Sequence, residues 1–350
     1  MRSILTRRKA QVFVSLGLLM SSAATAIEAH QRAPVGVLVK DREPACQFNP
    51  TFEFTEPQSV AWSNDNMASA AWFARAVQLV DELRAPAWEK LPERPLRVRD
   101  FVLKKFGLHG TLLEFSDRAL MLYRGTEDAL DYVLNGTFFT TSGEKFGLPG
   151  WVHNGFLVNF LMTWPDVHEE LKSIAAKGKS IVFASHSLGG VLSQYAAWLL
   201  ENEGIRVGRI YAFQSPNPGD LDFKNAFEKR FAGRASNTIY GEDVTPHIPP
   251  ILESTDAFGS SVPKPLSQVV VGLLNRARYG TLTERFAISG SGAPVAVPNA
   301  DVNDSEIRFW SSYLSKSGGK PFPLGLGPDS PFVADHDIDK VLCSLVKSLD

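Results

Sequence analysis

A strand, a tight turn and a helix follow one another within 20 residues, and this order limits the fold more than any other feature of the chain. Four apolar residues, 181–184, lead into Ser185-His-Ser-Leu-Gly-Gly190, and the helix-like segment 191–200 follows at once. This order predicts a nucleophile elbow with Ser187 on the strand-to-helix turn. Small residues flank such a serine because strand and helix nearly touch there, and the helix N–H groups point at developing negative charge. An ordinary strand–turn–helix that contains a serine is the alternative.

Strand-like and helix-like segments alternate through the middle of the chain, which predicts an α/β fold with a mostly parallel central sheet flanked by helices. Strands are expected at 119–123, 181–184, 209–213 and 237–240, helices at 68–84, 127–135, 156–177 and 191–200, and a helix followed by a short strand over 101–115. Residues 251–330 are less regular, with Gly and Pro clusters. No interdomain linker is visible, so residues 67–350 are expected to form one domain.

The N-terminus is typical of an export signal. A basic stretch through Lys9 precedes the apolar run Val12–Met20, which is too short to span a bilayer, and Ala24-Thr-Ala26 fits the cleavage rule. We therefore expect a signal peptide over 1–26, an irregular arm over 27–66, and a secreted or periplasmic protein. Arg7-Arg8 leaves a twin-arginine export route open. Ala10 and Gln11, however, stand where that signal would have apolar residues, so the general secretory route is favoured.

The charge of the chain restricts its binding partners, and its two cysteines leave open whether a disulfide forms. Without residues 1–26 the chain has 32 basic and 38 acidic residues, which argues against a nucleic-acid or anionic-membrane partner bound through bulk charge. The two cysteines, Cys46 and Cys343, form a disulfide or remain two buried thiols, since spacing alone does not decide. No metal-ligand spacing with a known mechanism is present, and no cofactor is expected.

A serine nucleophile needs a histidine to take its proton and a carboxylate to hold that histidine. In enzymes built on this elbow both partners follow the serine in the chain. Asp243 follows a strand-like segment, as an acid at a sheet edge should. Of the downstream histidines, His247 is fixed in a Pro-rich turn beside Asp243, so His336 is expected to be the base. Asp337 remains an alternative for the acid.

An oxyanion hole needs two backbone or side-chain donors beside the serine. One should be the N–H of Leu188, directly after the nucleophile, and the other should come from a loop at an earlier strand end. Arg124-Gly-Thr126 follows the expected strand 119–123 and suits that position, since glycine allows the backbone to approach closely.

Six short motifs occur in an order that resembles the fungal-type, class 3 lipase family of α/β-hydrolases. They are Tyr123-Arg-Gly-Thr126, Asp131-Tyr132, Val152-His-Asn-Gly-Phe156, Ser185-His-Ser-Leu-Gly-Gly190, Ala212-Phe-Gln-Ser-Pro216 and Asp243-Val-Thr-Pro-His-Ile-Pro249. The resemblance covers roughly residues 100 to 250 and the His336 segment. It implies Ser187 as nucleophile, Asp243 as acid, His336 as base, Thr126 and Leu188 as oxyanion hole, and a lid over 127–151.

Three features depart from the family pattern. Ser185 replaces the usual glycine, and Gln214 stands where glycine is common. The interval from Asp243 to His336 is long for the family, which implies an insertion within 251–330.

The resemblance implies a secreted serine hydrolase that cleaves carboxylic esters of lipids through an acyl-enzyme on Ser187, as a triacylglycerol lipase or esterase does, and that meets a lipid–water interface through its lid. A phospholipase A-type activity and a non-catalytic hydrolase-like binding protein remain alternatives. The sequence does not predict acyl-chain preference or oligomeric state.

Overall fold

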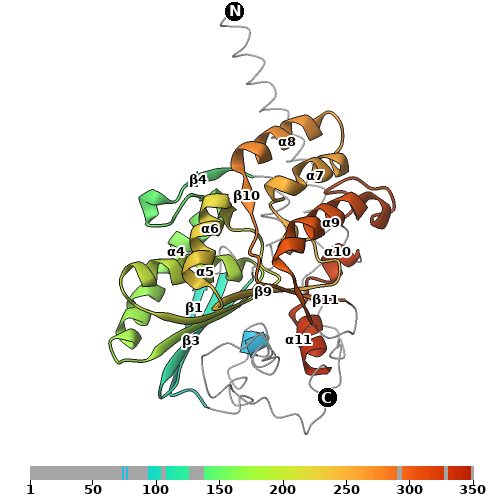
Figure 1. The fold of residues 1–350 in the computed structure, drawn as a ribbon. Coiled ribbons are helices and arrows are strands. Elements are labelled where there is room, and N and C mark those ends of the chain that lie inside the picture. Colours follow the sequence, from blue (N-terminus) through green and yellow to red (C-terminus); the bar gives the residue numbers. More distant parts are fainter. Residues whose placement is uncertain are drawn as a thin grey trace, which may run out of the picture.

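A mixed sheet forms the centre of the protein. A computed structural model describes residues 73–74, 76–77, 94–103, 108–125, 138–289, 294–326 and 330–347. Within these residues the main sheet has eight strands in the order β1-β2-β3-β6-β7-β9-β11-β12 (Figure 1). The strands are β1 (Arg97–Leu103), β2 (Leu108–Glu114), β3 (Arg118–Arg124), β6 (Ser180–His186), β7 (Val207–Phe213), β9 (Ala235–Tyr240), β11 (Arg285–Ile288) and β12 (Val295–Val297).

The pairing of these strands confirms the predicted α/β architecture. All pairs from β3 through β6, β7 and β9 to β11 are parallel, whereas β1–β2, β2–β3 and β11–β12 are antiparallel. Parallel strands end at the same edge of a sheet, so the loops after β3, β6, β7 and β9 meet on one side of the molecule.

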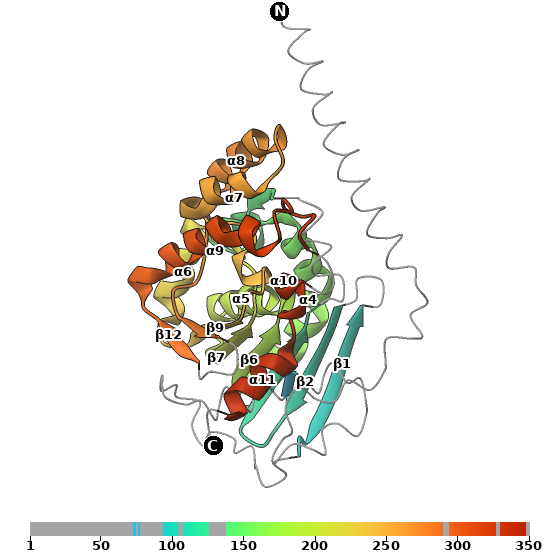
Figure 2. The same ribbon diagram turned by 90° about the vertical axis from the view of Figure 1, so that its right-hand side faces the viewer.

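Helices cover both faces of the main sheet. Those described are α4 (Asn154–Ala175), α5 (Leu188–Asn202), α6 (Leu221–Phe231), α7 (Thr255–Ser261), α8 (Leu266–Ala277), α9 (Val302–Lys316), α10 (Pro331–Ala334) and α11 (Ile338–Lys347), with 3-10 turns η3 (Glu144–Phe146), η4 (Thr245–His247), η5 (Leu252–Ser254) and η6 (Asn299–Asp301). Figure 1 shows α4, α5 and α6 on one face and α11 on the other, while α7, α8 and α9 lie together beyond the first face (Figure 2).

The alternation of side chains along the strands produces two hydrophobic cores. Met121 and Phe183 pack with the α4–α5 side, whereas Leu122 and Val182 pack with α11 and the helical residues near 74. Successive strand residues point to opposite faces, so the near-continuous apolar runs of β3 and β6 match a sheet that is buried on both sides.

A small second sheet lies beside α4 and α6. It consists of β4 (Thr140–Ser142), β5 (Trp151–His153), β8 (Gly219–Asp220) and β10 (Tyr279–Gly280), all antiparallel, in the order β10-β8-β5-β4. It connects the segment before α4 with the segment before α6.

Two sequence expectations were wrong. The helix expected within 101–115 is instead the β1–β2 hairpin, with Arg97 opposite Glu114. Its two strands hydrogen-bond to each other, and β2 also pairs with β3, so the apolar residues of this segment belong to the main sheet. Residues 251–330 are more regular than expected: α7, α8 and α9 pack on one another there. The predicted signal peptide and arm, and the helix expected at 127–135, lie outside the described residues.

Cys343 on α11 is buried and belongs to a disulfide. The sequence contains one other cysteine, Cys46, which lies outside the described residues. The expected free-thiol alternative is therefore wrong for Cys343.

Candidate active site

Ser187 occupies a sharp turn between β6 and α5, as the sequence predicts. Its backbone has φ 56° and ψ −134°, a conformation that side-chain-bearing residues rarely adopt. The Ser187 N–H donates to the carbonyl of Phe213 at the end of β7, at 2.9 Å. The side chain is buried, and its Oγ makes no hydrogen bond with any described residue. The turn thus holds a strained serine whose hydroxyl is available for chemistry.

The space around the turn explains why its neighbours are small. A Cβ on Gly190 would lie 2.5 Å from the side chain of Ser215, and a Cβ on Gly125 would lie 2.5 Å from the Cβ of Ser187. Ser185, which departs from the family glycine, fits because its Oγ forms a 2.5 Å hydrogen bond with Ser193 of α5. The substitution therefore adds a link between strand and helix.

His336 and Asp243 lie together although 93 residues separate them. The Nδ1 of His336 and the Oδ2 of Asp243 are 2.8 Å apart, and the ring nitrogen donates to the carboxylate. Asp243 is almost fully buried, and its other oxygen, Oδ1, accepts from the N–H of Thr245 at 2.9 Å. The carboxylate is thus fixed on both sides, with one oxygen committed to the histidine.

Asp337, the alternative acid, has a different role. Its Oδ1 accepts from the backbone N–H of Asp339 at the start of α11, at 2.9 Å. This is a helix N-cap, a common use of an aspartate at this position. The structure brings Asp243, not Asp337, against His336.

His336 also reaches the elbow through ring packing. Its imidazole stacks on that of His186 with ring centroids 4.6 Å apart and an interplanar angle of 26°. His186 directly precedes Ser187, so this contact joins the His336 loop to the turn that carries the serine. The loop ends of β6 and β9 thus supply Ser187 and Asp243, and the segment before α11 supplies His336.

His247 points away from this group, into a buried ionic cluster. Its ring stacks on Phe309 of α9, and its Nδ1 lies 3.0 Å from the Oε2 of Glu306. Arg285 donates to the other oxygen of Glu306 and to the carbonyl of Pro246. Burial alone would raise the pKa of Glu306, but His247 and Arg285 outweigh it and hold that pKa below its usual range. These contacts agree with the expectation that His247 is not the base.

Of the two expected oxyanion donors, the structure describes one. Leu188 is the first residue of α5, so its N–H has no acceptor within the helix. Thr126 lies outside the described residues, but its neighbour Gly125 is in close contact with Ser187. The loop that follows β3 therefore begins beside the nucleophile.

The predicted lid, 127–151, falls in two parts. Residues 127–137 lie outside the described residues. Residues 138–151 contain β4 and η3, and the carbonyl of Gly147 accepts hydrogen bonds from the side chains of Trp198 and Asn202 on α5. These contacts attach the second part to α5 in this conformation, and a lid over 127–151 stays a prediction.

His153 and Asp335 have contacts that explain their places in the motifs. His153 caps α4 by accepting from the N–H of Phe156 at 3.2 Å, which is a structural role. The Oδ2 of Asp335 accepts from the N–H of Glu242 at 2.9 Å, and its Oδ1 accepts from Lys340 at 2.8 Å. Glu242 lies 93 residues away in the chain, so no local pattern could have indicated this contact.

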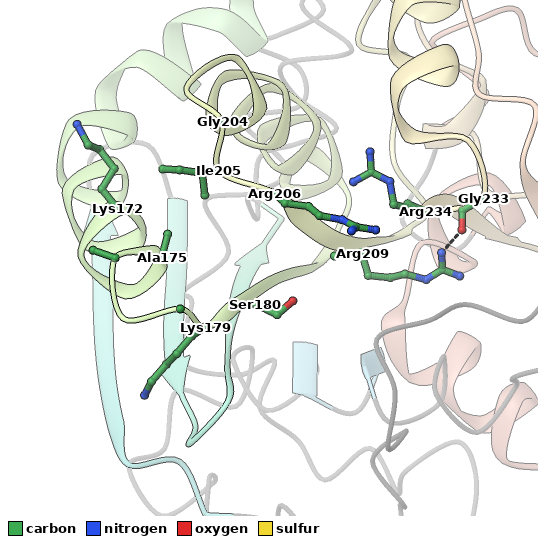
Figure 3. A pocket seen from close by; sticks show the side chains of 13 residues that line it. Lys172, Ala175, Lys179, Ser180, Gly204, Ile205, Arg206, Arg209, Gly233 and Arg234 are labelled. Atoms are coloured by element: carbon green, nitrogen blue, oxygen red, sulfur yellow. Dashed lines mark hydrogen bonds between the residues drawn. The ribbon is translucent and has the colours of Figure 1, made fainter.

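A basic cavity lies at the opposite edge of the main sheet. It has a volume of about 830 Å³ and is lined by residues at the amino ends of β6 and β7 (Figure 3). Three of its cations already have partners: Lys179 contacts Glu114, Arg234 contacts Glu201, and Arg209 donates to the carbonyl of Gly233. Ser187 and Asp243 lie at the carboxyl ends of the strands, and neither they nor His336 line this cavity.

Neither a metal-binding cluster nor a membrane-spanning helix is present among the residues that the structure describes. No group of three or more His, Cys, Asp or Glu side chains there is placed to hold a metal ion. None of the described helices has both the length and the apolar character needed to cross a membrane.

Comparison with known proteins places this arrangement in a known class. The structure of a mono- and diacylglycerol lipase mutant (MDLA N225Q) from Penicillium cyclopium superposes with a TM-score of 0.54, at 16% identity, over 79% of this chain and 96% of that one. The Lip2 lipase from Yarrowia lipolytica gives a TM-score of 0.50, at 16% identity, over 67% of this chain and 82% of that one. The fold is that of the α/β-hydrolases.

The sequence comparisons show which family this chain resembles. Residues 120–253 match the family model for class 3 lipases, and the predicted resemblance to that fungal-type family is confirmed. The secreted mono- and diacylglycerol lipases A of Penicillium cyclopium and Penicillium camembertii are each 25% identical to this chain over 139 residues. The match covers 37% of this chain, and it spans about two fifths (42%) of the length of those relatives.

Proposed function

We propose that this protein is a lipase-type carboxylic ester hydrolase with Ser187 as nucleophile, His336 as general base and Asp243 as the acid that orients it. The observation that carries the proposal is the 2.8 Å contact between His336 and a buried Asp243, beside a serine held at positive φ. A non-catalytic binding protein would have no use for a strained serine turn with a histidine–carboxylate pair next to it.

The geometry suits acyl transfer. Asp243 holds the Nδ1–H of His336, so the Nε2 lone pair is free to take the proton of Ser187 Oγ as that oxygen attacks an ester carbonyl. The carbonyl oxygen becomes an oxyanion that the N–H of Leu188, and in this proposal Thr126, stabilises. The C–O bond to the alcohol then breaks and His336 returns the proton to the leaving oxygen. Water, deprotonated by His336, then attacks the acyl-enzyme; the bond to Ser187 Oγ breaks, His336 returns the proton to that oxygen, and the acid is released.

The surroundings stabilise both charges that form in this step, the imidazolium of His336 and the oxyanion. As His336 becomes an imidazolium, Asp243 is 2.8 Å away and almost fully shielded from water, so their attraction is stronger than it would be in solvent. The first turn of α5 begins at the nucleophile, so its backbone N–H groups face the developing oxyanion.

The substrate class is proposed from the family. Its members among the relatives are described as mono- and diacylglycerol lipases, so we propose glycerol esters of fatty acids, with triacylglycerol-like substrates included. A phospholipase A-type activity uses the same machinery and is the second candidate. Because those relatives are secreted, we also propose that residues 1–26 direct export from the cell.

Covalent labelling tests the proposed function. A fluorophosphonate probe is expected to label the wild-type protein at one site, and peptide mass spectrometry should place the label on Ser187. A panel of triglycerides, diglycerides, phospholipids and short p-nitrophenyl esters then separates the substrate classes. A folded wild-type protein that neither reacts with the probe nor cleaves any ester would exclude the proposal.

We also propose activation at a lipid–water interface. Residues 127–137 lie outside the described residues, but Phe139, which follows them, exposes 45% of its surface, and Trp151 exposes 51%. Exposed aromatic side chains of this kind insert into lipid surfaces. The rate is therefore expected to rise more steeply once a short-chain triglyceride exceeds its solubility limit, and Phe139→Ser with Trp151→Ser should weaken that rise. A smooth saturation curve in the wild type would favour a plain esterase.

A further inference from the structure

Gln214 has a backbone conformation that a residue with a side chain adopts at a cost. It follows β7 with φ 53°, in the left-handed region, where class 3 lipases commonly have glycine. Its side chain is fully buried. Strain of this kind persists only where the surroundings compensate for it.

Both ends of the Gln214 amide are hydrogen-bonded. Its Nε2 donates to the backbone carbonyl of Asp335, and its Oε1 lies 3.0 Å from the Nε2 of His186. A carbonyl can only accept, so the NH2 group must face Asp335 and the oxygen must face His186. His186 therefore carries its proton on Nε2. Burial, with the neighbouring His336, lowers the pKa of His186 well below its usual range, which keeps this ring neutral.

These two bonds hold His336 from two directions. The neutral ring of His186 is the surface on which His336 stacks, with centroids 4.6 Å apart. Asp335 is the residue directly before His336, and its side chain is bound to the N–H of Glu242 and to Lys340. Gln214 thus fixes both the ring beneath His336 and the backbone that leads into it.

We propose that Gln214 is a positioning residue, which sets the imidazole of His336 over Ser187 by joining the carbonyl of Asp335 to the ring of His186. The inference rests on the proposed function, because it takes His336 to be the base. A glycine at position 214 would relieve the backbone but could form neither bond. The chain therefore keeps a strained residue whose side chain links the elbow to a histidine loop 121 residues away.

Gln214→Met tests the two hydrogen bonds at nearly constant side-chain length. Methionine can follow the same path but cannot donate to Asp335 or accept a strong bond from His186. Misplacing a catalytic group by about 1 Å costs up to about 100-fold in rate. With a soluble p-nitrophenyl ester we expect kcat to fall about 10- to 100-fold while KM changes less than about 3-fold, because the binding surface for substrate is untouched.

Gln214→Gly separates positioning from stability. Because glycine accepts φ 53° without strain, the variant is expected to melt at or above the temperature of the Met variant, yet to share its low kcat. Arg278→Gly is the matched control: Arg278 is an exposed residue at φ 51° at the end of α8, away from the site. That variant should gain the same backbone relief and keep the wild-type kcat.

The outcomes distinguish the inference from the function on which it rests. If wild-type protein reacts with a fluorophosphonate and cleaves the ester but Gln214→Met keeps wild-type kcat, the positioning role is wrong and the proposed function stands. If the wild type itself is unreactive, the proposed function has failed. If kcat in the Gln214 variants follows only the loss of thermal stability, the residue is structural and the inference is overturned.

Discussion

Replacing Ser187 with alanine is expected to lower the rate of ester hydrolysis about 10⁴-fold or more, with little change in stability. Loss of a nucleophile removes the covalent route altogether, and the residual rate comes from binding and the oxyanion donors. Alanine shares the backbone limits of serine at φ 56°, so the turn should keep its shape. The hydroxyl that is removed has no hydrogen-bond partner among the described residues, so its loss should not lower the melting temperature.

Two controls make the Ser187 experiment decisive. Circular dichroism and a melting curve establish that the alanine variant is folded, and fluorophosphonate labelling should be absent from it. Ser193→Ala, a buried serine on the same helix, should lose its contact with Ser185 but keep the label. Substantial hydrolysis by a well-folded Ser187→Ala protein would mean that another residue is the nucleophile.

The elbow was predictable because every part of it is local. Apolar β6, the small residues around Ser187 and the apolar face of α5 lie within about 20 residues, and the parallel arrangement follows from the alternation of strands and helices. The carboxylate was predictable only as one of two candidates. Asp243 and Asp337 both follow suitable elements, and it is the packing of the His336 loop against the end of β9 that separates them.

Other features were beyond a local pattern. β1 and β2 pair with each other and join the main sheet through the pairing of β2 with β3, and α7–α9 are stabilised by packing on one another. Gln214 was visible in the sequence only as a departure from glycine. Its meaning depends on contacts with His186 and Asp335, 28 and 121 residues away, which only the fold brings together.

Removing the side chain of His336 is expected to be nearly as damaging as removing that of Ser187, with a loss of about 10⁴-fold in kcat. His336 is the histidine that faces both Asp243 and the elbow. His336→Ala also leaves a buried carboxylate without its imidazole partner, at a cost of about 1–3 kcal/mol in stability. His336→Asn is the cleaner variant, since its amide can still donate to Asp243 but cannot act as a base. The kcat of Asp243→Asn should fall less than that of the His336 variants. Asp337→Asn should mainly weaken the first turn of α11.

His247 provides the matched comparison, because it is the other histidine downstream of the nucleophile. Its ring is buried against Phe309 and Glu306, so His247→Ala removes packing and one partner of a buried carboxylate. We expect a loss of about 2 to 5 kcal/mol in stability but a kcat within about 10-fold of wild type, measured below the melting transition. The two histidines should therefore separate catalysis from stability: His336→Asn inactive and folded, His247→Ala active and less stable. The reverse ranking in kcat would remove His336 from the mechanism and require a base that reaches Ser187 from the buried ionic cluster.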